Sequence, residues 1–502
     1  MKPVFWRQNI TIKRLLLIII LLSIIYVRHL VWKQGCLQMR FLKMNKTYTL
    51  LILIILLFSI NNITTAAPLD FEKLVEIGLE NNDSIQDIQQ DIAALERNIE
   101  LIKAGQDWQI TIDADYSRSE DYQDKEDGND GTLGLEFTKD YSSGFSIGPT
   151  VSITSDDYSP EYTVELSQRI FPWTPLESDK ELYSQEKELE KLKKELAESR
   201  VSQLTSWMEA YLNLIRLQAK ELLYKEQLKL AEEDLKEVIK KRDIGEAGQI
   251  ELLEAELAVK EAEYQFKNTS KEFEEGKKDF YQDLGLSNEE ELLLDENEDY
   301  LLTLMTKVSN FEIDPGKNTE LLQQAEGISY ELLANSFERE VLEKELEWLK
   351  SESNTDINLT GEYNTADEEG FTVGVNLSYL LYDGGQRKIE IADKEAEIID
   401  LLDEYKRLKR ELALEFEKKQ HQIELDQDKL SQNELTYEKR ILEEEIAKLQ
   451  LAEGLINQIA YEENSLNRKD QEIALAEARD NLFISKLNLL ALFKDESYFR
   501  GN

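Results

Sequence analysis

The sequence lacks the side chains on which disulfide frameworks and most metal centres depend. Its 502 residues include one cysteine and two histidines. The cysteine, Cys36, precedes the segment that we expect to be the mature protein, which therefore has no disulfide and no thiol chemistry. The histidine of that segment, His421, lies between two glutamines with no second histidine or cysteine for a metal, so we interpret it as a solvated helix position.

Proline and glycine are also scarce, with 7 and 21 residues, and this balance favours long helices over many small domains. No phosphate-binding loop of the form G-x-x-x-x-G-K-[ST] occurs. The acidic stretch 124–131 fails the spacing of a calcium loop. The sequence therefore predicts no catalytic residue, no cofactor and no metal, and we expect a protein that is not an enzyme.

Basic residues are fewer than acidic ones. The sequence has 59 Lys and Arg and 102 Asp and Glu, so the net charge is -43. Such a surface repels nucleic acid, which we exclude as a partner. The first 66 residues reverse the pattern, with nine basic side chains and no acidic one. The acidic remainder is typical of long, solvated helices.

Long hydrophobic runs occur near the N-terminus, at 15–27 and 50–60, and both fall short of the roughly 20 residues that a membrane-spanning helix needs. The second run resembles a secretory signal, because Lys46 precedes it and the small residues Thr64 to Ala67 follow it. We therefore predict a signal peptide over 44–66 and export of the rest.

Two questions about the N-terminal segment, 1–67, stay open at this point. Translation starts either at Met1 or at an internal methionine, Met39 or Met44. The run 15–27 is accordingly either an upstream artefact of start assignment or a tandem anchor.

An internal repeat is the most informative feature of the chain. The segment "IGEAGQIELLEAEL" (244–257) aligns with "EGLINQIAYEENSL" (453–466), which places Gly245 on Gly454 and gives an offset of 209 residues. Upstream, "VELSQRIF" aligns with "VNLSYLLY" in the same order. We infer a duplication, with the following parts: first repeat 68–290, linker 291–315, second repeat 316–494 and C-terminal tail 495–502.

Each half contains alternating apolar and polar runs that predict β-strands. Their length of about 9 to 11 residues is that of a tilted transmembrane strand, although a half-buried soluble sheet alternates in the same way. The predicted strands are 109–117 and 161–171, with an inserted hairpin 132–155, and then 355–363 and 371–381. Four or six strands cannot close a barrel alone, and open edges do not occur in lipid, so a barrel would be shared between subunits.

The rest of each half reads as helix. One helix is expected from about Asp70 to Gly105, and much longer ones follow the strands, with apolar positions at coiled-coil spacing. The long helices are predicted over 177–243, 246–285, 385–452 and 455–494. The longest measure roughly 100 Å at about 1.5 Å per residue, which exceeds any single globular core and predicts the wall of a tube or rod.

These features together resemble the outer-membrane efflux protein family of TolC-like channels, over roughly residues 68–494. The resemblance rests on the strand-to-helix join "LSYLLYDGGQRKIEIADKEAE", on the Gly-x-x-x-Gln-Ile turns at Gly245 and Gly454, and on "FYQDLGL" (280–286) at the end of the first half. No single motif is specific, but their order and spacing are.

The resemblance implies a mainly α protein with β: a homotrimer whose strands form one shared outer-membrane β-barrel, usually of 12 strands, continued by an α-helical tunnel through the periplasm. It would be the passive exit duct of a tripartite efflux or type I secretion system, with a periplasmic adaptor and an inner-membrane pump as partners. The alternative is an exported coiled-coil structural or interaction protein that spans the cell envelope. The sequence leaves open the substrate, whether drug, metal or polypeptide, and the cognate pump.

The resemblance also implies two kinds of site. Adaptors of such channels dock at the periplasmic tip, which corresponds here to Ile244, Gly245 and Glu246 and to Glu453, Gly454 and Leu455. The alternative for these turns is a plain helical hairpin with no partner.

A ring of carboxylates often narrows such channels six and nine residues after the second-half glycine. This sequence has Ala460 and Glu463 there, so one position departs from the pattern. The candidate constriction residues are Glu463, Glu462 and the first-half counterpart Glu254, which would disfavour anions.

The inserted hairpin 132–155 sets the expected number of strands. If it joined the barrel, a trimer would have 18 strands, and if it folded into the extracellular loop the number would be 12. We expect 12.

Overall fold

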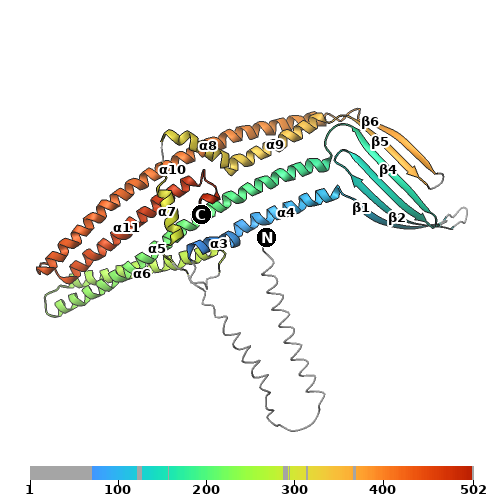
Figure 1. The fold of residues 1–502 in the computed structure, drawn as a ribbon. Coiled ribbons are helices and arrows are strands. Elements are labelled where there is room, and N and C mark those ends of the chain that lie inside the picture. The colour runs from blue at the N-terminus through green and yellow to red at the C-terminus, as the bar shows by residue number, and fades with distance from the viewer. Residues whose placement is uncertain are drawn as a thin grey trace, which may run out of the picture. The chain divides into compact units, whose positions relative to one another are not determined.

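The computed structural model describes a helical body with one β-sheet at one end (Figure 1). The predictions for the N-terminal segment 1–67, including its signal peptide and apolar runs, lie outside the described residues. The described residues are 70–120, 127–155, 158–286, 292, 294–312, 315–365 and 369–499. None of the described helices is long and apolar enough to cross a membrane.

The first repeat opens with two helices where the sequence suggested one. The carboxylate of Asp70 accepts a hydrogen bond from the Lys73 amide at 3.1 Å and caps α3 (Phe71–Asn81). Asn82 then interrupts the helix, because its side-chain oxygen accepts from the Ile85 amide and caps α4 (Asp83–Gly105). Its amide nitrogen also donates to the Asp283 carbonyl at 2.8 Å, so the break is fixed to the end of a distant helix.

The second repeat also has a break, between α8 (Asn318–Ile328) and α9 (Tyr330–Ser351), at Ser329, whose side chain makes no capping hydrogen bond. The expectation that 291–315 is a linker needs correction, since it contains the helix α7 (Asp299–Ser309), followed by the 3-10 turn η1 (Pro315–Lys317).

The C-terminal tail is structured as well. It forms α12 (Glu496–Phe499), and the Phe499 side chain is buried. The Tyr300 hydroxyl donates to the Phe499 carbonyl at 2.7 Å, and the Lys307 ammonium donates to the Tyr498 carbonyl at 2.8 Å. Both donors belong to α7, which therefore attaches the tail to the middle of the body.

Four long helices make up most of the body, and two of them have 67 residues without a proline or glycine. At about 1.5 Å per residue each of these measures roughly 100 Å. They form two antiparallel pairs that lie side by side (Figure 1). The pairs are α5 (Glu177–Asp243) with α6 (Gln249–Asp283), and α10 (Gln386–Ala452) with α11 (Gln458–Leu490).

A core of large, fully buried side chains lies where α3, α5, α6 and α7 meet. The side chains of Trp207, Tyr211 and Phe280 are at most 1 % exposed there. Gly78 permits this packing, because a Cβ atom at that position would lie 2.7 Å from the Trp207 ring and 2.6 Å from Leu284. Burial of these large side chains fixes the middle of the long helices and leaves their ends to other contacts.

The six strands of the described residues form one antiparallel sheet in sequence order. The strands are β1 (Gln109–Glu120), β2 (Asp127–Asp140), β3 (Phe145–Thr154), β4 (Pro160–Phe171), β5 (Thr355–Asn364) and β6 (Gly370–Tyr379). The two repeats meet at the β4–β5 ladder, from Thr163 opposite Asn364 to Phe171 opposite Ile357.

The inserted hairpin, β2–β3, is part of this sheet and lies between β1 and β4. The expectation that it folds into the extracellular loop is therefore wrong. Alternation could not decide the matter, because β1 and β4 have the same pattern whether they pair with each other or with the hairpin. The β1–β2 ladder runs without a gap from Gln109 opposite Thr138 to Glu120 opposite Asp127.

Candidate functional site

One face of the sheet is apolar across all six strands. The registers place Ile112 opposite Leu135, Leu135 opposite Val151 and Val151 opposite Tyr162. Apolar rows of this kind also cross the second-repeat strands, where Leu359 lies opposite Val375. Each row therefore joins side chains that are distant in the sequence into one continuous surface.

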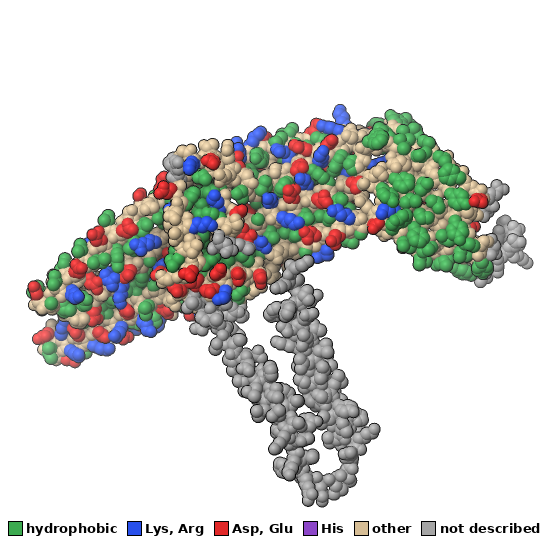
Figure 2. All heavy atoms as spheres, viewed as in Figure 1, with side chains coloured by type: hydrophobic (Ala, Val, Ile, Leu, Met, Phe, Trp, Pro, Cys, Tyr) green, Lys and Arg blue, Asp and Glu red, His purple; other side chains and the backbone are tan. Residues whose placement is uncertain are grey.

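This apolar face is open to solvent in a single chain. On β6 the side chains of Phe371, Val373, Val375 and Leu377 are 61 to 67 % exposed. Figure 2 shows hydrophobic side chains gathered over the sheet, whereas charges of both signs cover the helices. A contiguous apolar surface that extends over a whole sheet marks contact with a membrane or another protein.

The opposite face of the sheet is polar, and its charged side chains are mostly acidic. It carries small hydroxyl side chains such as Thr111, Thr150 and Thr163 in one row. Among the described side chains of the six strands, the basic residue on this face is Arg169, which donates to the Thr174 carbonyl. The described acidic residues on this face are Asp113, Asp115, Glu136, Asp140, Glu161, Glu165, Asp356 and Glu362.

Aromatic side chains lie where the strands meet the helices. The Lys139 ammonium lies 5.9 Å from the centre of the Trp108 ring and 5.3 Å from that of Tyr141. Trp173 and Tyr382, at the helix end of β4 and β6, are exposed. Trp, Tyr and Lys in this position are typical of the boundary between an apolar membrane band and water.

The far ends of the long helices turn in two matching glycine motifs. Gly245 has φ +81° and Gly454 has φ +71°, in the left-handed region. At the first turn the Glu246 amide donates a hydrogen bond to the Lys241 carbonyl at 2.8 Å. At the second turn the Leu455 amide donates to the Gln450 carbonyl at 2.8 Å. This is the Schellman pattern, which satisfies the last carbonyls of a helix.

The structure places the six predicted tip residues in these two turns, at the same end of the body (Figure 1). Ile244 and Leu455 are exposed apolar side chains, and Glu246 and Glu453 are exposed acids. No described atom outside the turns lies within 4 Å of a Cβ built on either glycine, so the turns need glycine for its dihedral angles and not for space.

The three candidate constriction residues lie near the tip on two helices. Glu463 and Glu254 are exposed, on α11 and α6. The Glu462 carboxylate accepts from the Gln458 amide at 2.8 Å. On α11, Glu462 and Glu463 lie between the buried side chains Ile459 and Leu466, which pack against α5.

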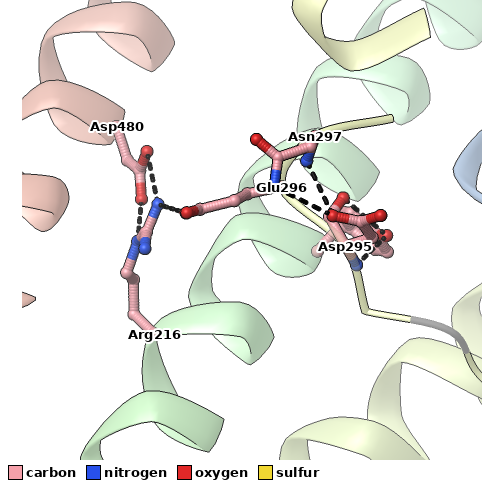
Figure 3. Close-up of polar contacts among 6 residues, drawn as sticks. Arg216, Asp295, Glu296, Asn297 and Asp480 are labelled. Atoms are coloured by element: carbon pink, nitrogen blue, oxygen red, sulfur yellow. Dashed lines mark hydrogen bonds and ion pairs between the residues drawn. The ribbon is translucent and has the colours of Figure 1, made fainter. Parts of the chain in front are cut away.

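Sequence reasoning missed one polar cluster in the middle of the body (Figure 3). The Arg216 guanidinium on α5 donates through Nε to Asp480 Oδ2 on α11 at 2.6 Å. Its Nη2 lies 2.8 Å from Glu296 Oε2, in the segment before α7. Asp480 is 7 % exposed. Burial raises the pKa of its carboxyl, and the hydrogen bond from Arg216 opposes this effect.

We name Arg216, Asp480 and Glu296 the α5–α11 clasp, because they join the two repeats and the segment between them. Its signal in the sequence is weak, since arginine and aspartate are common on acidic helices. The pairing of Asp480 with Arg216 can be recognised only from the packing of the helices, which buries Asp480.

Residues 74–274 match the model of a family described as Outer membrane efflux protein. Over these residues the chain is similar to the outer membrane efflux protein family. The matched residues include all four strands of the first repeat, which are β1, the inserted strands β2 and β3, and β4. They also include the first tip turn, at Gly245. It also agrees with the resemblance that the sequence motifs carry. A comparison with curated proteins found no match.

Solved outer-membrane channels share the fold over most of the chain. CusC superimposes with a TM-score of 0.63 at 11 % identity, covering 86 % of this chain and 95 % of its own. VceC from Vibrio cholerae gives 0.57 at 15 % identity, with 84 % and 95 % covered. The open state of MtrE from Neisseria gonorrhoeae gives 0.57 at 12 % identity, with 84 % and 88 % covered. At these identities the likeness shows the fold.

Proposed function

We propose that this protein is the outer-membrane exit duct of a tripartite efflux or type I secretion system. Copies of the chain would share one β-barrel in the outer membrane and one helical tunnel in the periplasm. The observation that carries the proposal is the two-faced sheet, apolar on one side and polar on the other, which continues into helices of roughly 100 Å. A sheet with these two faces fits the wall of an outer-membrane barrel, with lipid on its apolar face and water on its polar face.

The chain has two open edges that fit each other. Within one chain, α5 packs against α6 and α11, and α11 packs against α10, so α6 and α10 lie at opposite ends of the series (Figure 1). The strands follow the same order, with β1 at one edge and β6 at the other. Joining the β1–α6 edge of one copy to the β6–α10 edge of the next is a head-to-tail contact, which forms a ring when the rotation between copies closes.

Each edge helix carries an exposed apolar stripe near the tip. The stripe on α6 has side chains that are 54 to 73 % exposed: Ile250, Leu253, Leu257 and Tyr264. The stripe on α10 has side chains that are 53 to 70 % exposed: Leu449, Ile446, Leu442 and Leu435. Stripes at spacings of three, four and seven residues are the seams of coiled coils, but neither has a described partner within the chain.

The two stripes match in height above the tip. Ile250 lies five residues after Gly245, and Leu449 lies five residues before Gly454. The next three positions of each stripe follow at eight, twelve and nineteen residues from the same glycines. Since α6 leaves the tip and α10 approaches it, the stripes would pack as an antiparallel pair between neighbouring copies.

Three copies are the number that the resemblance to TolC-like channels implies. Tip residues Ile244 to Glu246 and Glu453 to Leu455 would then form a ring that a periplasmic adaptor can contact, with exposed apolar and acidic side chains. The inner-membrane pump would supply the energy, and the duct would conduct passively. Glu463, with Glu462 and Glu254, would place carboxylates near the tunnel entrance and favour cations.

Cysteine crosslinking between copies tests this arrangement. The background is clean, because Cys36 is the chain's one cysteine and can be replaced by serine. We expect the double variant Leu253→Cys, Ile446→Cys to form covalent dimers and trimers in outer-membrane fractions under mild oxidation. A disulfide requires Cβ atoms roughly 4 Å apart, so the reaction reports close contact.

The matched control combines Leu253→Cys with Leu435→Cys, which lies eleven residues further along the stripe than Ile446. That offset is about 16 Å on a helix and should prevent crosslinking. Equal crosslinking of both pairs, or of neither, would contradict the proposed interface. The alternative function, a coiled-coil spacer with a soluble sheet, predicts the protein outside the outer-membrane fraction, and the exposed apolar sheet face speaks against it.

A further inference from the structure

The β2–β3 hairpin occupies an interior position in the sheet. β1 pairs with β2, and β4 pairs with β3 and β5, so no described residue of β1 contacts β4 through a ladder. A hairpin that merely extended an extracellular loop would leave β1 and β4 paired with each other. β2 and β3 therefore form the part of the sheet between β1 and β4.

The hairpin has the same two faces as its neighbours. Leu135 on β2 and Val151 on β3 belong to the apolar row that starts at Ile112 and ends at Tyr162. Glu136, the next residue of β2, lies on the polar face opposite Thr150. The pattern is that of a strand with lipid on one side and water on the other.

The hairpin strands are also long enough to span the apolar band. β2 has 14 residues and β3 has 10, against 12 for β1 and 10 for β6. Ten residues at about 3.4 Å, tilted by about 40°, cover about 26 Å, which matches the apolar band of outer-membrane barrels at about 25 Å.

Pro149 in β3 is accommodated within the wall. Proline has no amide to donate and is rarely found in a strand with neighbours on both sides. The β2–β3 ladder pairs Glu136 with Thr150 and then Lys139 with Ile147, so it omits the positions opposite Pro149 and Gly148 while keeping its register. On the other side, Pro149 lies opposite Val164 in the β3–β4 ladder.

We infer that each copy contributes six strands to the membrane barrel, so that the trimer proposed above has a wall of eighteen strands. The inference rests on the proposed function for the presence of a shared barrel and for the number of copies. The sheet supplies the number of strands per copy, and the exposed edges β1 and β6 would pair with each other between neighbouring copies.

The dimensions of one copy agree with this count. Six strands about 4.8 Å apart and tilted by about 40° occupy about 38 Å of circumference. The four long helices, packed about 9 to 10 Å apart, occupy about 36 to 40 Å. Four strands at the same spacing and tilt would occupy about 25 Å.

The consequence is a wide exit. With the same spacing and tilt, an eighteen-stranded barrel has a backbone diameter of about 36 Å, against about 24 Å for twelve strands. The added hairpin thus increases the cross-section enclosed by the wall about twofold, and it brings Glu136 to the polar face in each copy.

Site-directed fluorescence tests the inference in the full-length protein reconstituted in lipid vesicles. With Cys36 replaced by serine, an environment-sensitive fluorophore is attached to Leu135→Cys or to Glu136→Cys on the inserted strand. The matched controls are Val373→Cys and Thr372→Cys, on the apolar and polar faces of β6. The quenchers are brominated lipid for the bilayer and iodide for water.

We expect brominated lipid to quench the labels at 135 and 373 to within about twofold of each other, and iodide to quench those at 136 and 372. Lipid quenching at 373 without quenching at 135 would overturn the inference and leave the proposed function intact. Absence of lipid quenching at both positions would instead refute the membrane barrel itself. If the Leu135 variant fails to fold, Val151→Cys on β3 provides the same test.

The mass of the assembly in native mass spectrometry completes the test. Three copies give eighteen strands, as inferred. Two copies would give twelve strands and would overturn the count even if both labels lie in lipid.

Discussion

Removing one side chain from the α6 stripe should weaken the assembly without weakening the single chain. We consider Leu257→Ala. Leu257 is 56 % exposed in the isolated chain, so its truncation costs little within that chain. In the proposed ring it lies at the height of Leu442 on α10 of the neighbouring copy, twelve residues from its own tip glycine.

The expected loss of interface stability follows from the part of the Leu257 side chain that is exposed in the isolated chain. Full burial of a leucine side chain stabilises by roughly 1.5 to 3 kcal/mol, and about half of that side chain is open here, so each interface should lose about 1 to 1.5 kcal/mol. A trimer has three such interfaces, and the assembly should lose about 3 to 5 kcal/mol in total. Each interface alone corresponds to roughly a tenfold change in its equilibrium constant.

The assay is thermal dissociation of the detergent-solubilised oligomer, followed by gel migration, with helical content measured by circular dichroism. The control is Leu222→Ala on α5, since Leu222 is 61 % exposed but lies outside both stripes. We expect the oligomer of the Leu257 variant to dissociate at a lower temperature and that of the Leu222 variant to behave as the unsubstituted protein. Equal dissociation temperatures for all three proteins would refute the interface.

Three further predictions concern single positions. Gly245→Ala should cost about 1 to 2 kcal/mol through its left-handed dihedral angle alone, whereas Gly285→Ala should cost clearly more, because its Cβ would also lie 2.6 Å from the Asn81 carbonyl oxygen; equal melting temperatures would contradict this. Asp480→Asn should destabilise by about 2 to 3 kcal/mol, since it weakens a charged hydrogen bond but leaves Arg216 beside Glu296. Because burial raises the pKa of Asp480, its contribution to the unfolding free energy should fall as pH rises from about 4 through the raised pKa, and the variant should lack that slope in pH-dependent thermal unfolding. Glu463→Gln should reduce the preference of the channel for cations, measured as a shift of reversal potential in a salt gradient; an unchanged potential would remove Glu463 from the constriction.

The long helices and the two-faced strands could be predicted from the sequence because both depend on local periodicity. α5 and α10 lack proline and glycine over 67 residues, and the strands alternate in every run. The internal repeat also predicted the order of the helices and strands, because both halves follow the same order. The tip turns at Gly245 and Gly454 follow from the same repeat, since a left-handed residue must end each helix before the chain reverses.

The position of the hairpin could not be predicted, because strand pairing is a long-range property. The strand β1 presents the same apolar side chains to lipid whether β2 or β4 lies beside it.

The helix breaks at Asn82 and Ser329 could not be predicted for another reason. Asn82 and Ser329 are residue types that cap helices, but only the folded chain shows that the Asn82 side chain caps α4 and that the Ser329 side chain makes no capping hydrogen bond.

The α5–α11 clasp shows a third limit. Charged residues on an acidic helix usually face water, and the sequence spacing of Arg216 and Asp480 contains no sign that α5 and α11 bring them together. Their pairing depends on how the two repeats pack, which local patterns do not encode.

The central claim is that several copies of this chain pool their six-stranded sheets into a water-filled pore. The most direct measurement is the electrical current through a planar lipid bilayer to which the purified oligomer is added. The claim predicts discrete, long-lived conductance steps that carry cations in preference to anions. A bilayer that stays electrically silent while intact oligomers are present in it would contradict the claim.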